Sequence, residues 1–189
     1  MMQQKTKAGL KVLFSSLFLL SSSACSIFAP AEPEMTDAEA CVKLHELIAD
    51  HAENFKQFRG SLKNTGTIRN MHNMQIWNAE RVFPMAKNCQ VWQWSSGLTN
   101  YYCGWDESDQ QDAKASFNQG AELVNQCLGK KWHSKFTRTT SGGESALFYQ
   151  KGGKTVVSIR YFKESRTISD SWMSTLYVGD ESNLKVKVQ

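Results

Sequence analysis

Two cysteines, Cys89 and Cys103, flank a turn signal, and their spacing constrains the fold of this 189-residue chain more than any other feature. Short strand-like segments lie on either side of Ser95-Ser96-Gly97, and a three-residue loop with glycine at its last, left-handed position is a favoured hairpin connection. Such a loop sets Trp94 opposite Leu98, and counting outward places Cys89 directly opposite Cys103. Opposed Cβ atoms on adjacent strands lie about 4.5 to 5.5 Å apart, which a disulfide can bridge with little movement. The sequence therefore predicts a hairpin closed by a Cys89–Cys103 disulfide.

Residues 1–24 have the three parts of a secretory signal peptide. Three lysines and no acidic residue stand at the start, the apolar run 12–20 (VLFSSLFLL) follows, and the small residues 21–24 end it. The apolar run is only about half of the roughly 20 residues that a membrane-spanning helix needs. The segment is therefore typical of a removable targeting signal, and we expect the chain to be exported.

The residues Ser22-Ser23-Ala24-Cys25 resemble a bacterial lipobox, in which small residues precede a cysteine that is diacylated and becomes residue one. The resemblance covers the export signal alone. It implies a membrane anchor through a lipid on Cys25 and, with Ser26 next, an outer-membrane lipoprotein facing the periplasm. The alternative is cleavage at Ala29-Pro30-Ala31, an A-x-A pattern that would release a protein without Cys25.

Either cleavage leaves four cysteines, and an even count in an exported chain predicts two disulfides. With Cys89 and Cys103 assigned to each other, Cys41 pairs with Cys127 by elimination. That second bridge closes a long loop and would stabilise the fold by roughly 4 kcal/mol on the chain-entropy model.

The net charge of +4 comes largely from the leader. The chain has 22 basic and 18 acidic residues, and residues 1–24 hold three of the basic ones, so the mature form is near +1 (19 minus 18). A near-neutral domain lacks the excess of positive charge that nucleic-acid-binding proteins carry, so we expect no nucleic-acid partner.

Two helices are expected. The first begins at the capping box Thr36-Asp37-Ala38-Glu39 and ends at Gly60. The second spans about 108–128, with Gly129 as the left-handed residue that follows it. Each has apolar residues at spacings of three and four: Cys41, Leu44, Ile48, Ala52 and Phe55 in the first, and Ala113, Phe117, Ala121, Val124 and Leu128 in the second.

The remaining segments predict strands, apart from residues 61–72, which are polar, contain Gly66 and are interpreted as a loop. Gly152-Gly153 predicts a two-residue turn that places Phe148 opposite Val157 and Ala146 opposite Ile159. The expected strands are 74–82, the two arms of the hairpin over 89–105, 132–140, 145–150, 155–163, 172–178 and an edge strand at 184–188.

The resulting order is α-β-β-β-α-β-β-β(-β), which predicts one α+β domain over 36–189 with two helices packed on an antiparallel sheet. Residues 25–35, with Pro30 and Pro33, form an extended tether ahead of it. A helix followed by a strand meander occurs twice, which suggests a pseudo-repeat.

No pattern of catalytic or metal-binding residues is recognisable, so we expect no enzyme, no metal site and no cofactor. His45 and His51 are six apart and fall on different faces of the expected helix, while His72 and His133 lie on other segments. The acidic group Asp106, Glu107, Asp109 and Asp112 stands where a helix dipole favours negative charge.

Six tryptophans, Trp77, Trp92, Trp94, Trp105, Trp132 and Trp172, are the one compositional excess. Most should belong to the core, but Trp92, Trp94 and Tyr102 share one face of the hairpin and are candidates for binding a partner. The leading hypothesis is a non-catalytic envelope lipoprotein that binds a protein or other macromolecule, such as an enzyme or toxin that it inhibits. The alternatives are a periplasmic carrier of a small apolar ligand and an enzyme of unfamiliar geometry.

Overall fold

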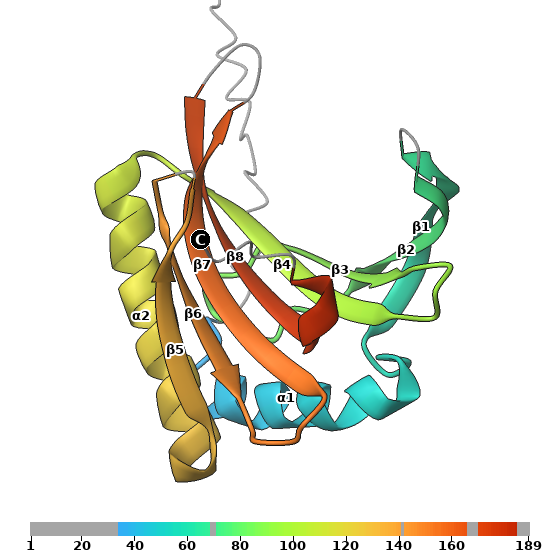
Figure 1. The fold of residues 1–189 in the computed structure, drawn as a ribbon, viewed down its shortest axis with the longest axis horizontal. Coiled ribbons are helices and arrows are strands. Elements are labelled where there is room, and N and C mark those ends of the chain that lie inside the picture. The colour runs from blue at the N-terminus through green and yellow to red at the C-terminus, as the bar shows by residue number, and fades with distance from the viewer. Residues whose placement is uncertain (1–33, 69–70, 141, 166–169, 185–189) are drawn as a thin grey trace, which may run out of the picture. The chain divides into compact units, whose positions relative to one another are not determined.

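The structure is a computed structural model that describes residues 34–68, 71–140, 142–165 and 170–184. These residues form two α-helices and eight strands in one antiparallel sheet (Figure 1), so the predicted α+β class is confirmed. The leader, the lipobox and most of the tether lie outside the described residues, as does the expected edge strand beyond Leu184. No helix in the described ranges is both long and apolar enough to span a membrane.

The described chain consists of a helix followed by four strands, twice over. The first set is α1 (Asp37–Asp50), β1 (Arg59–Ile68), β2 (Met71–Ala79), β3 (Asn88–Gln93) and β4 (Thr99–Glu107). The second set is α2 (Gln110–Leu128), β5 (His133–Arg138), β6 (Glu144–Tyr149), β7 (Thr155–Ser165) and β8 (Asp170–Asp180). Three short 3₁₀ turns, η1 (His51–Glu53), η2 (Gly129–Lys131) and η3 (Glu181–Asn183), follow α1, α2 and β8.

The two meanders meet at their last strands. The strand order is β1-β2-β3-β4-β8-β7-β6-β5, so β4 and β8 form the centre of the sheet and β1 and β5 form its edges. The second meander is thus arranged as the reverse of the first, in line with the pseudo-repeat suggested by the sequence.

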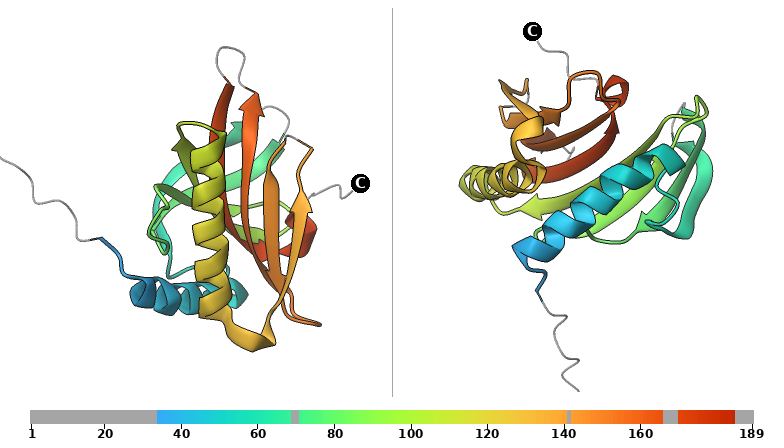
Figure 2. Two further views of the ribbon diagram at one scale, coloured as in Figure 1. Left: turned by 90° about the vertical axis from the view of Figure 1, so that its left-hand side faces the viewer. Right: turned by 90° about the horizontal axis from the view of Figure 1, so that it is seen from below.

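Both helices pack on the same face of the sheet and share one hydrophobic core with it (Figure 2). Leu44 and Leu47 of α1 and Phe117 and Val124 of α2 belong to this core. The strands contribute alternate residues, among them Val91, Tyr101, Cys103, Phe148, Val157, Ile159, Leu176 and Val178. Since successive side chains of a strand point to opposite faces, the intervening residues face away from the helices.

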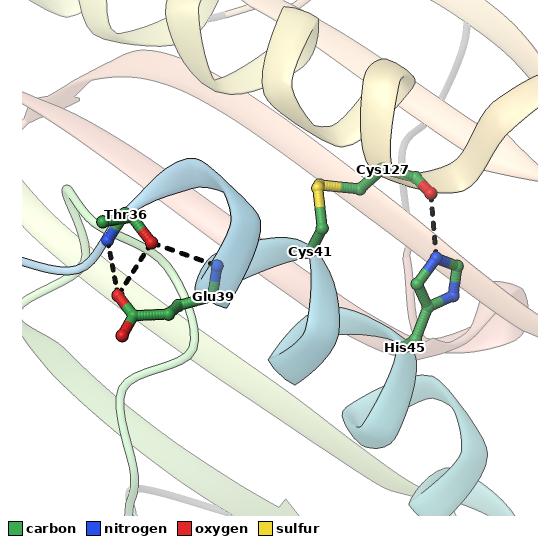
Figure 3. The surroundings of a disulfide bond; sticks show 5 residues. All are labelled: Thr36, Glu39, Cys41, His45 and Cys127. Carbon is green, nitrogen blue, oxygen red and sulfur yellow. Dashed lines mark hydrogen bonds between the residues drawn. A yellow bond between two sulfur atoms is a disulfide. The ribbon is translucent and has the colours of Figure 1, made fainter.

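The capping box at the start of α1 forms as predicted. The Thr36 hydroxyl accepts a hydrogen bond from the Glu39 amide at 3.3 Å, and the Glu39 carboxylate accepts one from the Thr36 amide at 2.8 Å (Figure 3). At α2, Asp109 is the N-cap and accepts from the Gln111 and Asp112 amides, and Gly129 follows the helix with φ 66°.

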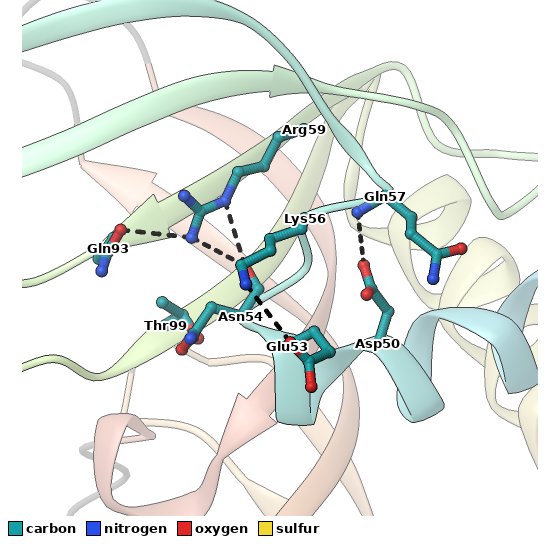
Figure 4. A network of polar contacts seen from close by, with 8 residues as sticks. All are labelled: Asp50, Glu53, Asn54, Lys56, Gln57, Arg59, Gln93 and Thr99. Carbon is teal, nitrogen blue, oxygen red and sulfur yellow. Dashed lines mark hydrogen bonds and ion pairs between the residues drawn. The ribbon is translucent and has the colours of Figure 1, made fainter.

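The predicted end of the first helix at Gly60 is wrong, because α1 ends at Asp50 and a turn follows. Asn54 and Phe55 both have left-handed φ angles, 60° and 57°, a conformation that asparagine tolerates far better than phenylalanine. Asp50 stabilises the turn by accepting a hydrogen bond from the Gln57 amide at 2.8 Å (Figure 4). The turn buries Phe55 completely and leaves Ala52, expected on the apolar stripe, exposed.

The expected loop at 61–72 is also wrong, since these residues form most of β1 and the start of β2. The pairing places Asn64 opposite Ile76 and Gly66 opposite Met74, with shifts in register along the strand. β1 pairs on one side only, so it needs few apolar side chains and its sequence lacks the alternation that marks a half-buried strand. Its Leu62 is 51% exposed.

The β3–β4 hairpin has the predicted register. Cys89 lies opposite Cys103, the Trp94 amide donates to the Leu98 carbonyl at 2.9 Å, and Gly97 has φ 84°. The sequence predicts three strands before the second helix, 74–82 and the two hairpin arms. The structure has four, because β1 is added to them.

The β6–β7 connection agrees with the sequence in register but not in the turn itself. Phe148 pairs with Val157 and Ala146 with Ile159, as expected. The turn hydrogen bond, however, runs from the Gly153 amide to the Gln150 carbonyl at 2.9 Å, and Gly152 alone of the two glycines has a positive φ, 77°. The predicted two-residue turn at Gly152-Gly153 is therefore wrong by one position.

Two disulfides are present, and they join the pairs that the sequence predicts. Cys89–Cys103 links β3 to β4 with a Cα–Cα distance of 4.0 Å. Cys41–Cys127 links α1 to the end of α2 across 86 residues of chain, with a Cα–Cα distance of 4.8 Å. The His45 Nε2 atom lies 2.8 Å from the Cys127 carbonyl oxygen beside this bridge (Figure 3). Two disulfides are compatible with an extracytoplasmic protein.

Candidate binding face

The face of the sheet that points away from α1 and α2, called here the helix-free face, holds the strongest candidate site. Its central row of directly paired residues crosses six strands: Gln90, Tyr102, Tyr177, Ser158, Leu147 and Lys135. A parallel row contains Gly104, Thr175, Arg160, Ser145 and Thr137. Trp92, opposite Asn100, stands at the β3 end of this face.

The structure brings the sequence-predicted aromatic residues together. The ring centroids of Trp92 and Tyr102 are 5.2 Å apart, and those of Trp92 and Trp94 are 6.3 Å apart in an edge-on arrangement. All three side chains are half-buried. We call this group the aromatic cluster.

Hydrogen bonds within the chain hold the two indoles of the aromatic cluster. Trp92 Nε1 donates to the Gln90 side chain at 2.8 Å, and Trp94 Nε1 donates to the Asn100 side chain at 3.1 Å. A partner that covered these rings would therefore bury apolar surface without leaving an indole N–H group unbonded. The cluster is preorganised for contact.

Tyr102 connects the aromatic cluster to the centre of the sheet. Its hydroxyl donates a hydrogen bond to the Met173 sulfur at 3.7 Å, and a Cβ atom on Gly104 would come within 3.3 Å of that hydroxyl. Burial raises the pKa of Tyr102, and nearby Arg160 acts in the opposite direction. The phenol thus stays a neutral donor at ordinary pH.

Arg160 is the principal cation at the centre of this face. Its Nε atom donates to the Thr175 hydroxyl at 3.1 Å, and its guanidinium carbon lies 5.3 Å from the Phe162 ring centroid. Burial lowers the pKa of Arg160, while Tyr102 and Tyr177 oppose that shift. Among the described residues it forms no ion pair with a carboxylate.

A hollow of about 340 Å³ lies at the β5–β7 side of the helix-free face. Strand residues and the chain around η3 line it: Lys135, Thr137, Ser145, Leu147, Tyr149, Ser158, Glu181 and Leu184. Most of these side chains are polar, so the hollow suits a ligand that forms hydrogen bonds.

The other four tryptophans contact the interior, as expected. Trp105 is buried and donates to the Glu107 carboxylate at 2.8 Å, and Trp172 lies 5.8 Å from the Tyr161 ring. Trp77 and Trp132 pack against the hydrophobic core, and the Arg59 guanidinium carbon lies 4.0 Å from the Trp77 ring.

One constellation was not foreseen from the sequence. His51 Nδ1 lies 2.7 Å from the Thr155 hydroxyl, and His51 Nε2 lies 3.4 Å from an Asp180 carboxylate oxygen. A hydroxyl, an imidazole and a carboxylate in line can support nucleophilic catalysis. Here, however, the His51 imidazole is only 9% exposed and is stacked on Phe55. These contacts are better suited to a structural role, in which His51 links the end of α1 to β7 and β8. No local motif signals it, because Thr155 and Asp180 meet only through the β7–β8 register.

The remaining histidines are dispersed. His133 lies 5.6 Å from the Tyr149 ring on β5, and His72 is a residue of β2. In the described part of the chain no group of three or more His, Cys, Asp and Glu side chains is placed to hold a metal ion.

No protein family matches this chain, and neither the curated proteins nor the solved structures contain a significant match.

Proposed function

We propose that this chain is a non-catalytic lipoprotein of the bacterial envelope that binds a macromolecular partner through its helix-free face. A lipid on Cys25 anchors it in the outer membrane, on the periplasmic side, and the partner is a protein such as an enzyme or toxin that it inhibits. The observation that carries the proposal is the aromatic cluster, whose indole N–H groups are bonded internally while the rings remain partly accessible.

The energetics of protein interfaces support this role. Tryptophan and tyrosine are enriched among the few residues that dominate binding, and truncating such a residue typically costs about 2 kcal/mol or more. Trp92 contacts both Trp94 and Tyr102, so the cluster is ordered before a partner arrives and loses little conformational entropy on binding.

The two alternative functions have weaker support. A carrier needs an apolar space for its ligand, whereas Phe55, Phe83 and Tyr101 are fully buried between the helices and the sheet, and most of the residues that line the hollow on the helix-free face are polar. An enzyme needs an accessible reactive group, whereas the Thr155–His51–Asp180 line found among the described residues contains a nearly buried His51.

Capture from envelope extract tests the proposal. The native mature protein would be immobilised beside its Trp92→Ala and Trp94→Ala variants, with Phe136→Ala as the matched control. Phe136 is an aromatic residue on β5 that is 60% exposed and pairs with core-facing Ala146, so it belongs to the other face. Circular dichroism would establish that each variant folds.

The expected result is a discrete partner that binds the wild type and Phe136→Ala equally and binds either tryptophan variant at least about tenfold more weakly. Capture of no specific partner, or equal capture by all four proteins, would contradict the proposal.

A further inference from the structure

Five side chains that line the hollow on the helix-free face can donate hydrogen bonds: those of Lys135, Thr137, Ser145, Tyr149 and Ser158. Ser145 and Ser158 line it and are 3% and 1% exposed, and their hydroxyl oxygens lie 3.3 Å from each other. One hydroxyl donates to the other, so the second hydroxyl hydrogen has no acceptor within the described residues. A ligand oxygen in the hollow could accept this hydrogen bond in place of water.

Arg160 adds donors beside this serine pair. It lies directly opposite Ser145 on one side and Thr175 on the other, all three on the helix-free face. Its Nε–H group is bonded to Thr175, while no hydrogen bond from its terminal Nη atoms is formed among the described residues. A guanidinium has five N–H donors in a fixed fork that matches a carboxylate or phosphate.

The strands around the serine pair carry an excess of positive charge. Residues 123–163 contain eight lysines and arginines but one acidic residue, Glu144, whereas the rest of the chain has 14 basic and 17 acidic residues (22 minus 8, and 18 minus 1). Glu144 is already engaged, by the Tyr161 hydroxyl at 3.3 Å and by Lys114 at 3.9 Å. Lys135 lines the hollow, so two cations flank the serine pair.

Glu181 is the one carboxylate among the residues that line the hollow. Its side chain is exposed, as is that of Lys135, so solvent screens both of these charges. The buried members of the lining, Ser145 and Ser158, are neutral donors.

We infer that this hollow binds an oxyanion, either a carboxylate or a phosphate group. Lys135, which lines the hollow, and Arg160, which lies beside it opposite Ser145, supply the positive charge, and the serine pair donates a hydrogen bond. This inference goes beyond the proposed function, because it specifies the chemical class of a ligand. The hollow would bind a free anion as well as an anionic group carried by a partner.

Titration of the native mature protein with inorganic phosphate and with acetate tests the inference. Ionic strength is held constant with chloride, because general screening would otherwise imitate binding. The readout is the ¹⁵N–¹H signal of the Arg160 Nε–H group, assigned by its loss in Arg160→Gln, together with the thermal unfolding midpoint. The variants are Arg160→Gln, Lys135→Gln and Ser145→Ala, and the matched control is Lys154→Gln, an exposed lysine in the β6–β7 turn that is not part of the lining.

A saturable shift of the Arg160 signal with phosphate or acetate is expected in the wild type and in Lys154→Gln. The affinity should fall at least about tenfold in Lys135→Gln, and the anion-dependent rise in the unfolding midpoint should be lost in Arg160→Gln. Ser145→Ala should bind the anion more weakly than the wild type and fold normally. This variant therefore still tests the inference if Arg160→Gln does not fold. No saturable shift, or affinities in Lys135→Gln and Ser145→Ala equal to that of Lys154→Gln, would overturn the inference.

A competition arm identifies the source of the anion. If the group belongs to the partner, phosphate at saturating concentration should release the captured partner from the wild type. If the partner stays bound while phosphate binds, the hollow takes a free anion. Failure to capture any partner would count against the proposed function alone, because the titration uses no partner.

Discussion

Tyr102 lies directly opposite Tyr177 on β4 and β8, the strands where the two halves of the sheet meet. Each tyrosine is followed two residues later by a glycine, and the tyrosine hydroxyl lies close to the position that the glycine's Cβ atom would take, 3.3 Å away at Gly104 and 2.9 Å away at Gly179. The Tyr177 hydroxyl also donates to the Asp180 carbonyl at 2.7 Å. The centre of the helix-free face is thus built from the pattern Tyr-x-Gly used twice.

Gly179→Ala should destabilise the protein. Its new Cβ atom would lie 2.9 Å from Asn100 Cβ, 2.9 Å from the Tyr177 hydroxyl and 3.0 Å from the Thr99 carbonyl oxygen. Overpacking of this kind typically costs about 1 to 3 kcal/mol, which urea denaturation would measure. Gly104→Ala is the comparison: its nearest contact is the movable end of Tyr102 at 3.3 Å, so its cost should be smaller. Equal stability of Gly179→Ala and the wild type would show that the tyrosine does not need this space.

Asp50→Ala should weaken the turn that ends α1. Asp50 is 4% exposed, and its carboxylate accepts the hydrogen bond from the Gln57 amide. Its removal should lower the free energy of unfolding by about 2 kcal/mol, since it leaves that amide unpaired in a partly buried place. Glu53→Ala is the control, because Glu53 is exposed and its ion pair with Lys56 should contribute less than about 1 kcal/mol. Similar losses in both variants would refute a special role for Asp50.

Stability should fall at high pH because of Tyr101. Burial raises the pKa of Tyr101, whose hydroxyl donates to the Glu80 carbonyl at 2.7 Å. The folded pKa lies above the unfolded value of about 10, so the stabilisation is complete below that pH and is lost as pH rises above it.

The expected slope is about 1.4 kcal/mol of unfolding free energy per pH unit above pH 10 for this residue. Burial raises the pKa of Tyr102 too, so Tyr101→Phe should reduce the slope without removing it. Denaturation series between pH 8 and the alkaline limit of the assay would measure both slopes. An unchanged slope in Tyr101→Phe would assign the alkaline loss to other groups.

Local signals predicted the parts of this fold that short segments determine by themselves. The register of the β3–β4 hairpin follows from Gly97, and the register in turn brings Cys89 to Cys103 and gathers the aromatic cluster on one face. The second helix follows from its apolar residues at spacings of three and four and from Gly129 at its end, whereas the N-cap role of Asp109 became clear only in the structure.

The features that sequence reasoning missed depend on contacts between distant segments. Phe55 leaves the helical path because its ring packs near Tyr101, with centroids 6.4 Å apart, and this burial overrides the helical periodicity. β1 depends on pairing with β2 rather than on a pattern of its own. The hollow depends on residues of β5, β6 and β7, among them Lys135, Ser145 and Ser158. Only the pairing of these strands brings them together, and no short motif encodes that pairing.

The central claim is that this chain acts outside the cytoplasm as a disulfide-bonded protein held by a lipid on Cys25. The intact mass of the native purified protein tests it most directly. We expect a polypeptide that starts at Cys25, carries the added mass of a lipid and lacks the four thiol hydrogens of Cys41, Cys89, Cys103 and Cys127. A full-length product with its leader retained and all of its thiols free would overturn this proposal.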